Sequence, residues 1–292
     1  MSLPRLNRLF AADGRCLVVA VDHGQFREPS WLGHIRDMPH IIASQIAAGP
    51  DAITLAGGQA PLLQDVQSRA KPALVLRADL TNAYTADRTG PAFCFRLEGA
   101  VERAVALDAV CVVAAILELP GHPDLYAECL RNVAALRAEC DRVGMALMVE
   151  VLAMSSRDGV PDVVEDARTI ATLARQAAEL GADVVKTDPT TPVEDYAAVV
   201  EAGGGRPVLA SGGSPVQDDR GPGAADAAVI RRTEAILATG AAGVSYGRPV
   251  VWAADPPAMT RALAQVVHGG VTADEAIRSM GSAAGAAGAA GA

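Results

Sequence analysis

Short runs of apolar and β-branched residues recur along the chain at intervals of roughly 20–40 residues, and stretches with helical spacing lie between them. The region 162–180 is one such stretch, because apolar residues recur there every three or four positions. Glycines stand where several of these helices are expected to end, at Gly49, Gly144, Gly181 and Gly240. The eight runs cover residues 16–21, 52–55, 73–76, 109–116, 146–151, 183–185, 207–210 and 243–245.

Strands that are apolar throughout, each followed by a helix, are typical of parallel strands buried on both faces. Eight such units predict a single (β/α)8 barrel over residues 1–280, followed by a Gly/Ala-rich tail at 281–292 that we expect to be disordered. An open, doubly wound sheet is the alternative. It is disfavoured because no GxGxxG motif follows the first run.

Composition narrows the range of partners. Apolar residues make up 50% of the chain, and a net charge of −9 with scattered basic residues argues against nucleic acid. The apolar runs are too short to cross a bilayer, which needs about 18–20 residues. The five cysteines show no CxxC pair, so we expect buried, reduced thiols. Together with the lack of a signal-peptide pattern, this predicts a cytoplasmic protein.

In a barrel of this kind, chemistry belongs to the loops at the carboxyl ends of the strands. Lys186 closes the sixth run, Gly181-Ala-Asp-Val-Val-Lys. Burial there favours the neutral amine, which is a nucleophile toward carbonyl carbons. The alternative is that Lys186 forms a structural ion pair with Asp22 or Glu150.

Two carboxylates follow other runs. Glu150 ends a run that is otherwise fully apolar, where an unpaired carboxylate is costly, so we expect it to pair with Lys186 and to move protons there. A surface arginine could hold it instead. Asp22 is either a proton acceptor or a turn cap, and the role of the neighbouring His23 is open.

Glycine-rich segments at the last two strands indicate a phosphate site, since barrels commonly bind phosphate there. The predicted contacts are Ser211, Gly212 and Gly213 at the seventh strand and Gly247 and Arg248 at the eighth. Arg77, at the end of the third run, joins this substrate-binding set. Metal catalysis is the rival chemistry, but only His23 of the five histidines falls at a strand end, so we expect no metal and no cofactor.

These segments resemble the class I aldolase family that includes archaeal-type fructose-bisphosphate aldolase, aminodideoxyheptulosonate synthase and the thiolase acting on phosphorylated autoinducer-2. The resemblance implies a (β/α)8 barrel, a Schiff base on Lys186, catalysis by Asp22 and phosphate binding at Gly212, Gly213, Gly247 and Arg248. It also suggests a homo-oligomer. The matching segments run from Ala20-Val-Asp-His-Gly through Val75-Leu-Arg, Val185-Lys-Thr, Ala210-Ser-Gly-Gly and Gly243-Val-Ser-Tyr-Gly-Arg to Ala258-Met and Val266-Val-His.

The fifth strand departs from the family pattern. Aldolases and synthases of this family carry a tyrosine there, usually as Tyr-Pro-Arg-Gly, whereas this chain has Leu152-Ala-Met-Ser-Ser-Arg-Asp-Gly. Glu150 is instead similar to a glutamate of related tagatose-bisphosphate and sulfofructose-phosphate aldolases. The basic residue expected after the strand-seven glycines is replaced by Ser214-Pro215.

We therefore predict a class I aldolase that cleaves or forms a C–C bond of a ketose, phosphorylated in the leading hypothesis, through a Schiff base on Lys186. Within the same fold, the alternatives are acyl transfer, as in a thiolase, and transaldol chemistry. A barrel that isomerises or binds a sugar phosphate without a covalent intermediate is a further alternative from a different class.

Overall fold

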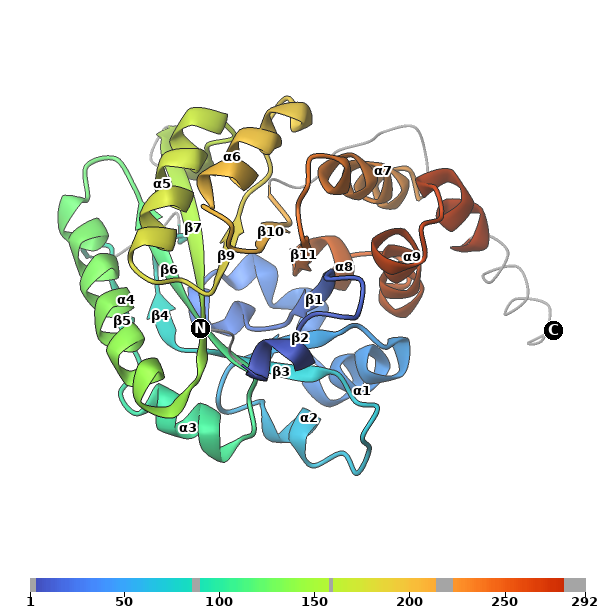
Figure 1. Cartoon of the computed structure of the whole chain (residues 1–292), viewed down its shortest axis with the longest axis horizontal. Helices are drawn as coiled ribbons and strands as arrows, with labels where there is room; N and C mark the ends of the chain where they lie inside the picture. Colours follow the sequence, from blue (N-terminus) through green and yellow to red (C-terminus); the bar gives the residue numbers. More distant parts are fainter. Residues whose placement is uncertain (1–3, 86–89, 158–159, 214–222, 281–292) are drawn as a thin grey trace.

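The computed structural model describes residues 4–85, 90–157, 160–213 and 223–280. Eight parallel strands form a ring in which each strand pairs with the next one along the chain, and the last pairs with the first (Figure 1). The ring strands are β1 (Cys16–Ala20), β2 (Ala52–Leu55), β3 (Ala73–Arg77), β6 (Cys111–Glu118), β7 (Ala146–Arg157), β9 (Val184–Thr187), β10 (Val208–Ser211) and β11 (Gly243–Tyr246).

This ring confirms the predicted (β/α)8 barrel, and each of the eight apolar runs overlaps one ring strand. An open doubly wound sheet would leave two edges, but here β6 pairs with β7 over eight residues and completes the circle. Two of the glycines predicted to end helices do so. Gly49 and Gly144 adopt the left-handed conformation directly after two of the helices, as expected for residues that end helices.

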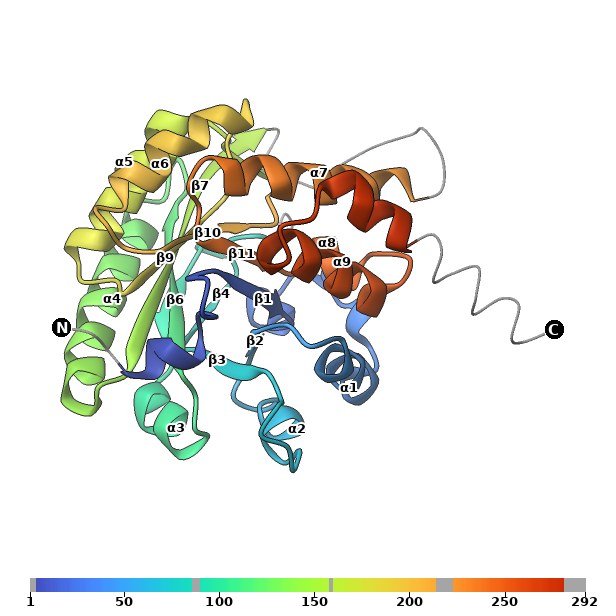
Figure 2. The same ribbon diagram turned by 45° about the vertical axis from the view of Figure 1, so that its right-hand side comes forward.

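Helices surround the strands on the outside of the ring (Figure 2). None of the helices in the described ranges combines the length and the hydropathy needed to cross a membrane. The helices are α1 (Met38–Ala48), α2 (Pro61–Gln64), α3 (Ala100–Ala106), α4 (Pro123–Val143), α5 (Ala167–Glu179), α6 (Tyr196–Ala202), α7 (Ala224–Ala238), α8 (Arg248–Val251) and α9 (Pro256–His268).

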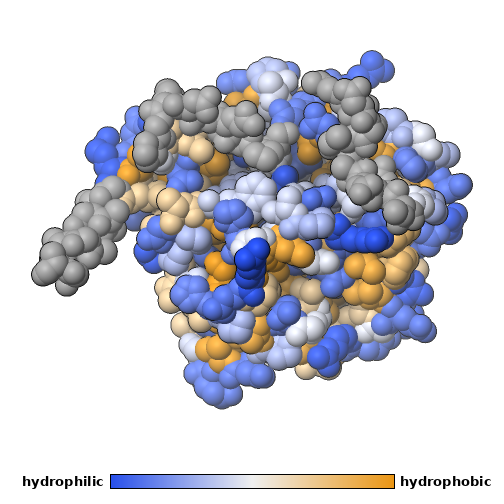
Figure 3. All heavy atoms as spheres, turned by 180° about the vertical axis from the view of Figure 1, so that it is seen from behind, coloured by the Kyte–Doolittle hydropathy of each residue, from blue (hydrophilic) through white to orange (hydrophobic). Residues whose placement is uncertain are grey.

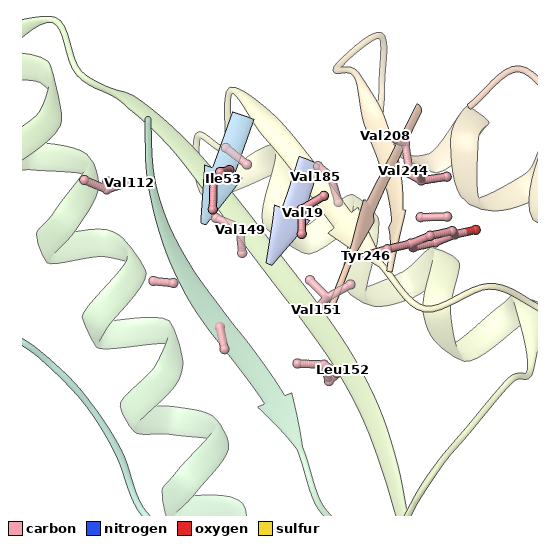
Figure 4. Close-up of a cluster of buried hydrophobic side chains, with 14 of the residues drawn as sticks. Val19, Ile53, Val112, Val149, Val151, Leu152, Val185, Val208, Val244 and Tyr246 are labelled. Atoms are coloured by element: carbon pink, nitrogen blue, oxygen red, sulfur yellow. The ribbon is translucent and has the colours of Figure 1, made fainter. Parts of the chain in front are cut away.

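The alternation of side chains along the strands produces two buried apolar layers. Residues such as Val18, Val75 and Met148 point into the barrel and form an inner cluster, to which Leu9 contributes from the N-terminal segment. Their neighbours along the strands belong to a second, larger cluster that also contains residues of the helices, and Val19, Ile53, Val149, Val185 and Val244 are members of it labelled in Figure 4. The core therefore lies both inside the ring and between the ring and the helices.

Two antiparallel strand pairs lie beyond the carboxyl ends of ring strands and were not predicted from the sequence. β4 (Asp79–Thr81) pairs with β5 (Cys94–Arg96), and the end of β7 pairs with β8 (Val160–Val163). The second hairpin corrects the helix predicted over residues 162–180. Residues 162 and 163 belong to β8, and the helix begins only after Asp166, whose side chain accepts a hydrogen bond from the Thr169 amide.

The remaining surface is mixed in character. Hydrophilic residues are spread over the whole face seen in Figure 3, with smaller hydrophobic areas between them. All five cysteines are buried and free, as expected. The predicted tail at 281–292 and the Ser214-Pro215 segment lie outside the described residues.

Candidate active site

Polar side chains replace apolar ones where the inward-facing rows of the barrel reach the carboxyl ends of the strands. Along β7, Met148 belongs to the inner cluster and is followed, two residues on, by Glu150. Along β9, Val184 is followed in the same way by Lys186, and Leu209 of β10 by Ser211. Because side chains alternate along a strand, the polar residue two positions after each core residue also points toward the barrel axis.

A cavity opens at this end of the barrel. It brings together eight of the nine predicted site residues, which come from the ends of five of the ring strands. Those eight are Asp22, Glu150, Lys186, Ser211, Gly212, Gly213, Gly247 and Arg248. The wall also contains residues outside the predicted set, namely Ala20, His23, Phe26, Trp31, Tyr84, Leu152, Val163, Asp188, Ser245 and Pro249.

Lys186 and Glu150 form an ion pair on the floor of this cavity. The Lys186 Nζ atom lies 2.6 Å from Glu150 Oε1, and the two residues are register partners on adjacent parallel strands. Both side chains are almost completely buried, with 7% of Lys186 and 5% of Glu150 exposed. The pairing predicted from sequence for Glu150 is therefore present, and the arginine that holds its other oxygen is the buried Arg77 rather than a surface residue.

Arg77 lies beside the floor rather than on the cavity wall. Its guanidinium contacts three carboxylates, at 2.5 Å from Glu150 Oε2, 2.5 Å from Asp79 Oδ1 and 3.6 Å from Asp22 Oδ2. Only 1% of Arg77 is exposed. Arg77 was expected to contact the substrate, but it is not among the residues that line the cavity. Instead, Arg77 fixes the carboxylates that surround the lysine.

The charges of this network shift the pKa values of its members in opposite directions. Burial by itself raises the pKa of Glu150, but attraction and hydrogen bonding from Lys186 and Arg77 outweigh it and bring the pKa to about 2. Burial raises the pKa of Asp22 above its ordinary value, because its partner Arg77 is more distant. Glu150 is therefore held as an anion, whereas Asp22 binds a proton more readily.

The glycines at β10 and β11 allow close packing of the opposite wall. Gly213 has a φ of +61°, which strains any residue with a side chain. A Cβ there would also lie 2.9 Å from Pro189, so both the backbone conformation and the available space favour glycine. Two guanidinium groups fix this turn: Arg248 donates to the Gly213 carbonyl at 2.9 Å and Arg232 to the Gly212 carbonyl at 2.6 Å. Arg232 was not predicted, since its place on α7 gives no sequence signal.

Aromatic residues gather around Arg248. Its guanidinium carbon lies 4.7 Å from the centre of the Trp31 ring and 5.8 Å from that of Trp252. Trp31 is also packed against Tyr84, with 4.8 Å between ring centres. Trp31 precedes α1 and Tyr84 follows β4, so the sequence gave no reason to expect either at the site.

His23 lies in the same wall and is neutral. Burial, together with the positive charges of Arg248 and Lys186, lowers its pKa to about 3. A Cβ at position 247 would lie 2.6 Å from its Nε2 atom, so Gly247 is required for this ring to occupy its position. Its Nδ1 atom is buried and has no hydrogen-bond partner in the described part of the chain.

Comparison with known proteins places this geometry in a family. The model of the DeoC/LacD family aldolases matches residues 16–253, and the chain belongs to this family. It is 34% identical over 281 residues to the 2-amino-3,7-dideoxy-D-threo-hept-6-ulosonate synthase of Halobacterium salinarum, covering 95% of both chains. It is 27% identical to the 3-hydroxy-5-phosphonooxypentane-2,4-dione thiolase of Escherichia coli, over 93% of this chain and 84% of the thiolase.

Among solved structures, that of a Schiff-base-forming fructose-1,6-bisphosphate aldolase superposes with a TM-score of 0.71. It is 26% identical, and the match covers 90% of this chain and 98% of that one. These findings confirm the resemblance read from the motifs. The protein is an aldolase-family enzyme with a small-molecule substrate.

Proposed function

We propose that this enzyme is a class I aldolase that cleaves or forms a C–C bond of a ketose through a Schiff base on Lys186. The observation that supports this proposal most directly is the single buried amine on the cavity floor, 2.6 Å from the Glu150 carboxylate. The family includes a structure described as Schiff-base-forming, which agrees with the proposal.

In the cleavage direction, Lys186 gives up its ammonium proton and the amine adds to the ketose carbonyl. A proton returned to the carbinolamine hydroxyl then lets water leave, which gives an iminium. Removal of a proton from the hydroxyl on the far side of the scissile bond lets that bond break, and its electron pair passes into the enamine. Glu150 suits stabilisation of the cationic iminium, because it is held as an anion at the nitrogen. Asp22, which lies near the lysine, is a proton acceptor for the steps that form the iminium in this proposal.

A phosphorylated ketose is the substrate class we favour. Gly212, Gly213 and Gly247 bring backbone to the cavity wall without side chains, and Arg248 adds a guanidinium there. Ser211 belongs to the same wall, although its hydroxyl donates a hydrogen bond to Asp188. The Glu150 position and the lack of a tyrosine between 146 and 157 leave the particular ketose open.

Acyl transfer, as in a thiolase, is the second candidate, since one relative bears that name. We also expect a cytoplasmic homo-oligomer, which sedimentation of the purified protein and fractionation of cells would test.

Borohydride trapping tests the proposal with little ambiguity, because the chain contains only two lysines, Lys71 and Lys186. Incubation with dihydroxyacetone phosphate and borohydride should add one reduced adduct, located on Lys186 by peptide mass spectrometry. Lys71→Met is the matched control. Lys71 donates to the backbone carbonyls of Gln64 and Val66 at the other end of the barrel, so this variant should trap normally. Adduct formation on Lys71, or none in the native enzyme, contradicts the proposal.

A further inference from the structure

We propose that Asp188 is a catalytic residue that carries the proton between the substrate hydroxyl and the enamine carbon during C–C cleavage. This inference rests on the proposed function, because it assigns a step of the lysine-dependent reaction. Asp188 was not among the residues predicted from the sequence.

The backbone places Asp188 beside the nucleophile. It follows Lys186 by two residues at the end of β9, and both residues line the cavity. The intervening Thr187 points the other way, where its hydroxyl is 2.6 Å from that of Tyr196. Alternation along the strand therefore directs Lys186 and Asp188 to the same side, toward the barrel axis.

The two oxygens of Asp188 have different environments. Oδ1 accepts a hydrogen bond from the Ser211 hydroxyl, which fixes the orientation of the carboxyl group. Oδ2 is buried and has no hydrogen-bond partner among the described residues. Only 4% of Asp188 is exposed. A buried carboxyl oxygen without a partner is costly unless a ligand supplies one, and the cavity that Asp188 lines is where substrate would bind.

The other two carboxylates of the site are less suited to this step. Glu150 has both oxygens occupied, by Lys186 and by Arg77, and its pKa of about 2 makes its conjugate acid too scarce to return a proton near neutral pH. Asp22 has Arg77 as a neighbour at 3.6 Å. Asp188 is in no ion pair within the described ranges, and burial raises its pKa, although the Ser211 hydrogen bond opposes this.

The step balances as follows. The Asp188 carboxylate accepts the proton of the substrate hydroxyl, the O–H electron pair forms the aldehyde carbonyl, and the C–C bond breaks. The electron pair of that bond forms the enamine and neutralises the iminium nitrogen. After the aldehyde leaves, the protonated Asp188 returns the same proton to the enamine carbon, and hydrolysis frees Lys186. Condensation is the reverse sequence.

Solvent exchange separates this role from formation of the Schiff base. With dihydroxyacetone phosphate alone in D₂O, the native enzyme should exchange one hydrogen on the carbon next to the iminium, because enamine formation removes it. Asp188→Asn should still give the borohydride adduct on Lys186 but should exchange about 10²–10⁴-fold more slowly, the usual range for loss of a general acid–base group. Asp188→Glu restores the carboxyl and should recover part of the rate.

Asp183→Asn is the matched control, since Asp183 is a carboxylate at the opposite end of the same strand. It accepts from Arg137 at 2.7 Å and from the Leu147 amide at 2.9 Å, outside the cavity, so adduct formation and exchange should both be native. Native exchange in Asp188→Asn overturns the assignment. So does joint loss of the adduct and of exchange in both Asp188 variants, which would mean that Asp188 serves the lysine instead. Failure of the native enzyme to form an adduct overturns the proposed function itself.

Discussion

Lys186 and Glu150 are register partners on the adjacent parallel strands β9 and β7, with 2.6 Å between the amine nitrogen and the carboxylate oxygen. Because register partners in a parallel ladder project from the same face of the sheet, this contact is set by strand register and not by a flexible loop. Arg77 holds the other oxygen of Glu150 at 2.5 Å, so the carboxylate has a single orientation. The pair is thus preorganised for chemistry at one point of the cavity floor.

Lys186→Met is expected to abolish turnover and to leave the fold intact. Methionine has nearly the volume of lysine and introduces no buried charge, and Glu150 keeps Arg77 as a partner. Steady-state assays should detect no cleavage, while the far-UV circular dichroism and the urea midpoint stay near native. Measurable turnover in this variant would remove the lysine from the mechanism.

Glu150→Gln is expected to lower kcat by about 10²–10⁴-fold. The amide keeps the shape of the side chain but cannot balance the charge of an iminium on Lys186. The comparison variant is Asp22→Asn, measured under the same conditions. Near-native turnover in Glu150→Gln with collapse in Asp22→Asn would assign the essential carboxylate to Asp22 and leave Glu150 as a structural partner of the lysine.

Arg248→Ala is expected to raise KM for a phosphorylated ketose by roughly 10- to 150-fold, equivalent to about 1.5–3 kcal/mol for a charge-assisted contact. The dephosphorylated sugar is the control substrate, and its KM should change far less. Equal effects on both substrates would mean that Arg248 acts through the packing it provides, since it also donates to the Gly213 carbonyl and contacts Trp31.

His268 should make stability depend on pH, because its two ring nitrogens each lie 2.9 Å from a carboxylate, one from Asp13 and one from Asp51. The hydrogen bond to Asp51 is the main reason that its pKa is raised above the ordinary value of 6.5. The protonated ring therefore stabilises the fold fully below about pH 6.5, and this contribution is lost as the pH rises through the folded-state pKa.

His268→Gln should accordingly lower the urea midpoint more at pH 5.5 than at pH 8.5, while kcat stays native because the site is at the other end of the barrel. A difference between variant and native protein that is the same at both pH values would show that folding does not raise the pKa of the ring.

Several features of the site could be predicted from sequence because they depend on local pattern. The apolar runs located all eight ring strands, and the position of Lys186 at the end of one run was sufficient to place it at the mouth of the barrel. Glu150 followed from the same logic, since a carboxylate at the end of an apolar strand requires a cation. The glycines at β10 and β11 were found because glycine-rich segments at the ends of strands can be recognised from residue type alone.

Other features had no local signal. Arg77 was predicted to contact substrate because it ends the third run, yet it lies among three carboxylates from three different segments. Asp79 is only two residues from Arg77 in the sequence, but Asp22 and Glu150 are brought to it by the tertiary structure. The helix predicted over 162–180 begins late because residues 160–163 pair with the end of β7, and this hairpin overrides the helical spacing.

The sequence by itself determined the number and order of the strands and the residues at their carboxyl ends, because a buried strand appears as a local run of apolar residues. The tertiary structure alone decided which of those end residues meet. It paired Lys186 with Glu150 through register, fixed Arg77 as their support, and left one oxygen of Asp188 without a partner among the described residues beside the nucleophile. The physical reason is that charge balance in a buried site depends on distances between strands, which are set by the closure of the barrel and not by any one segment.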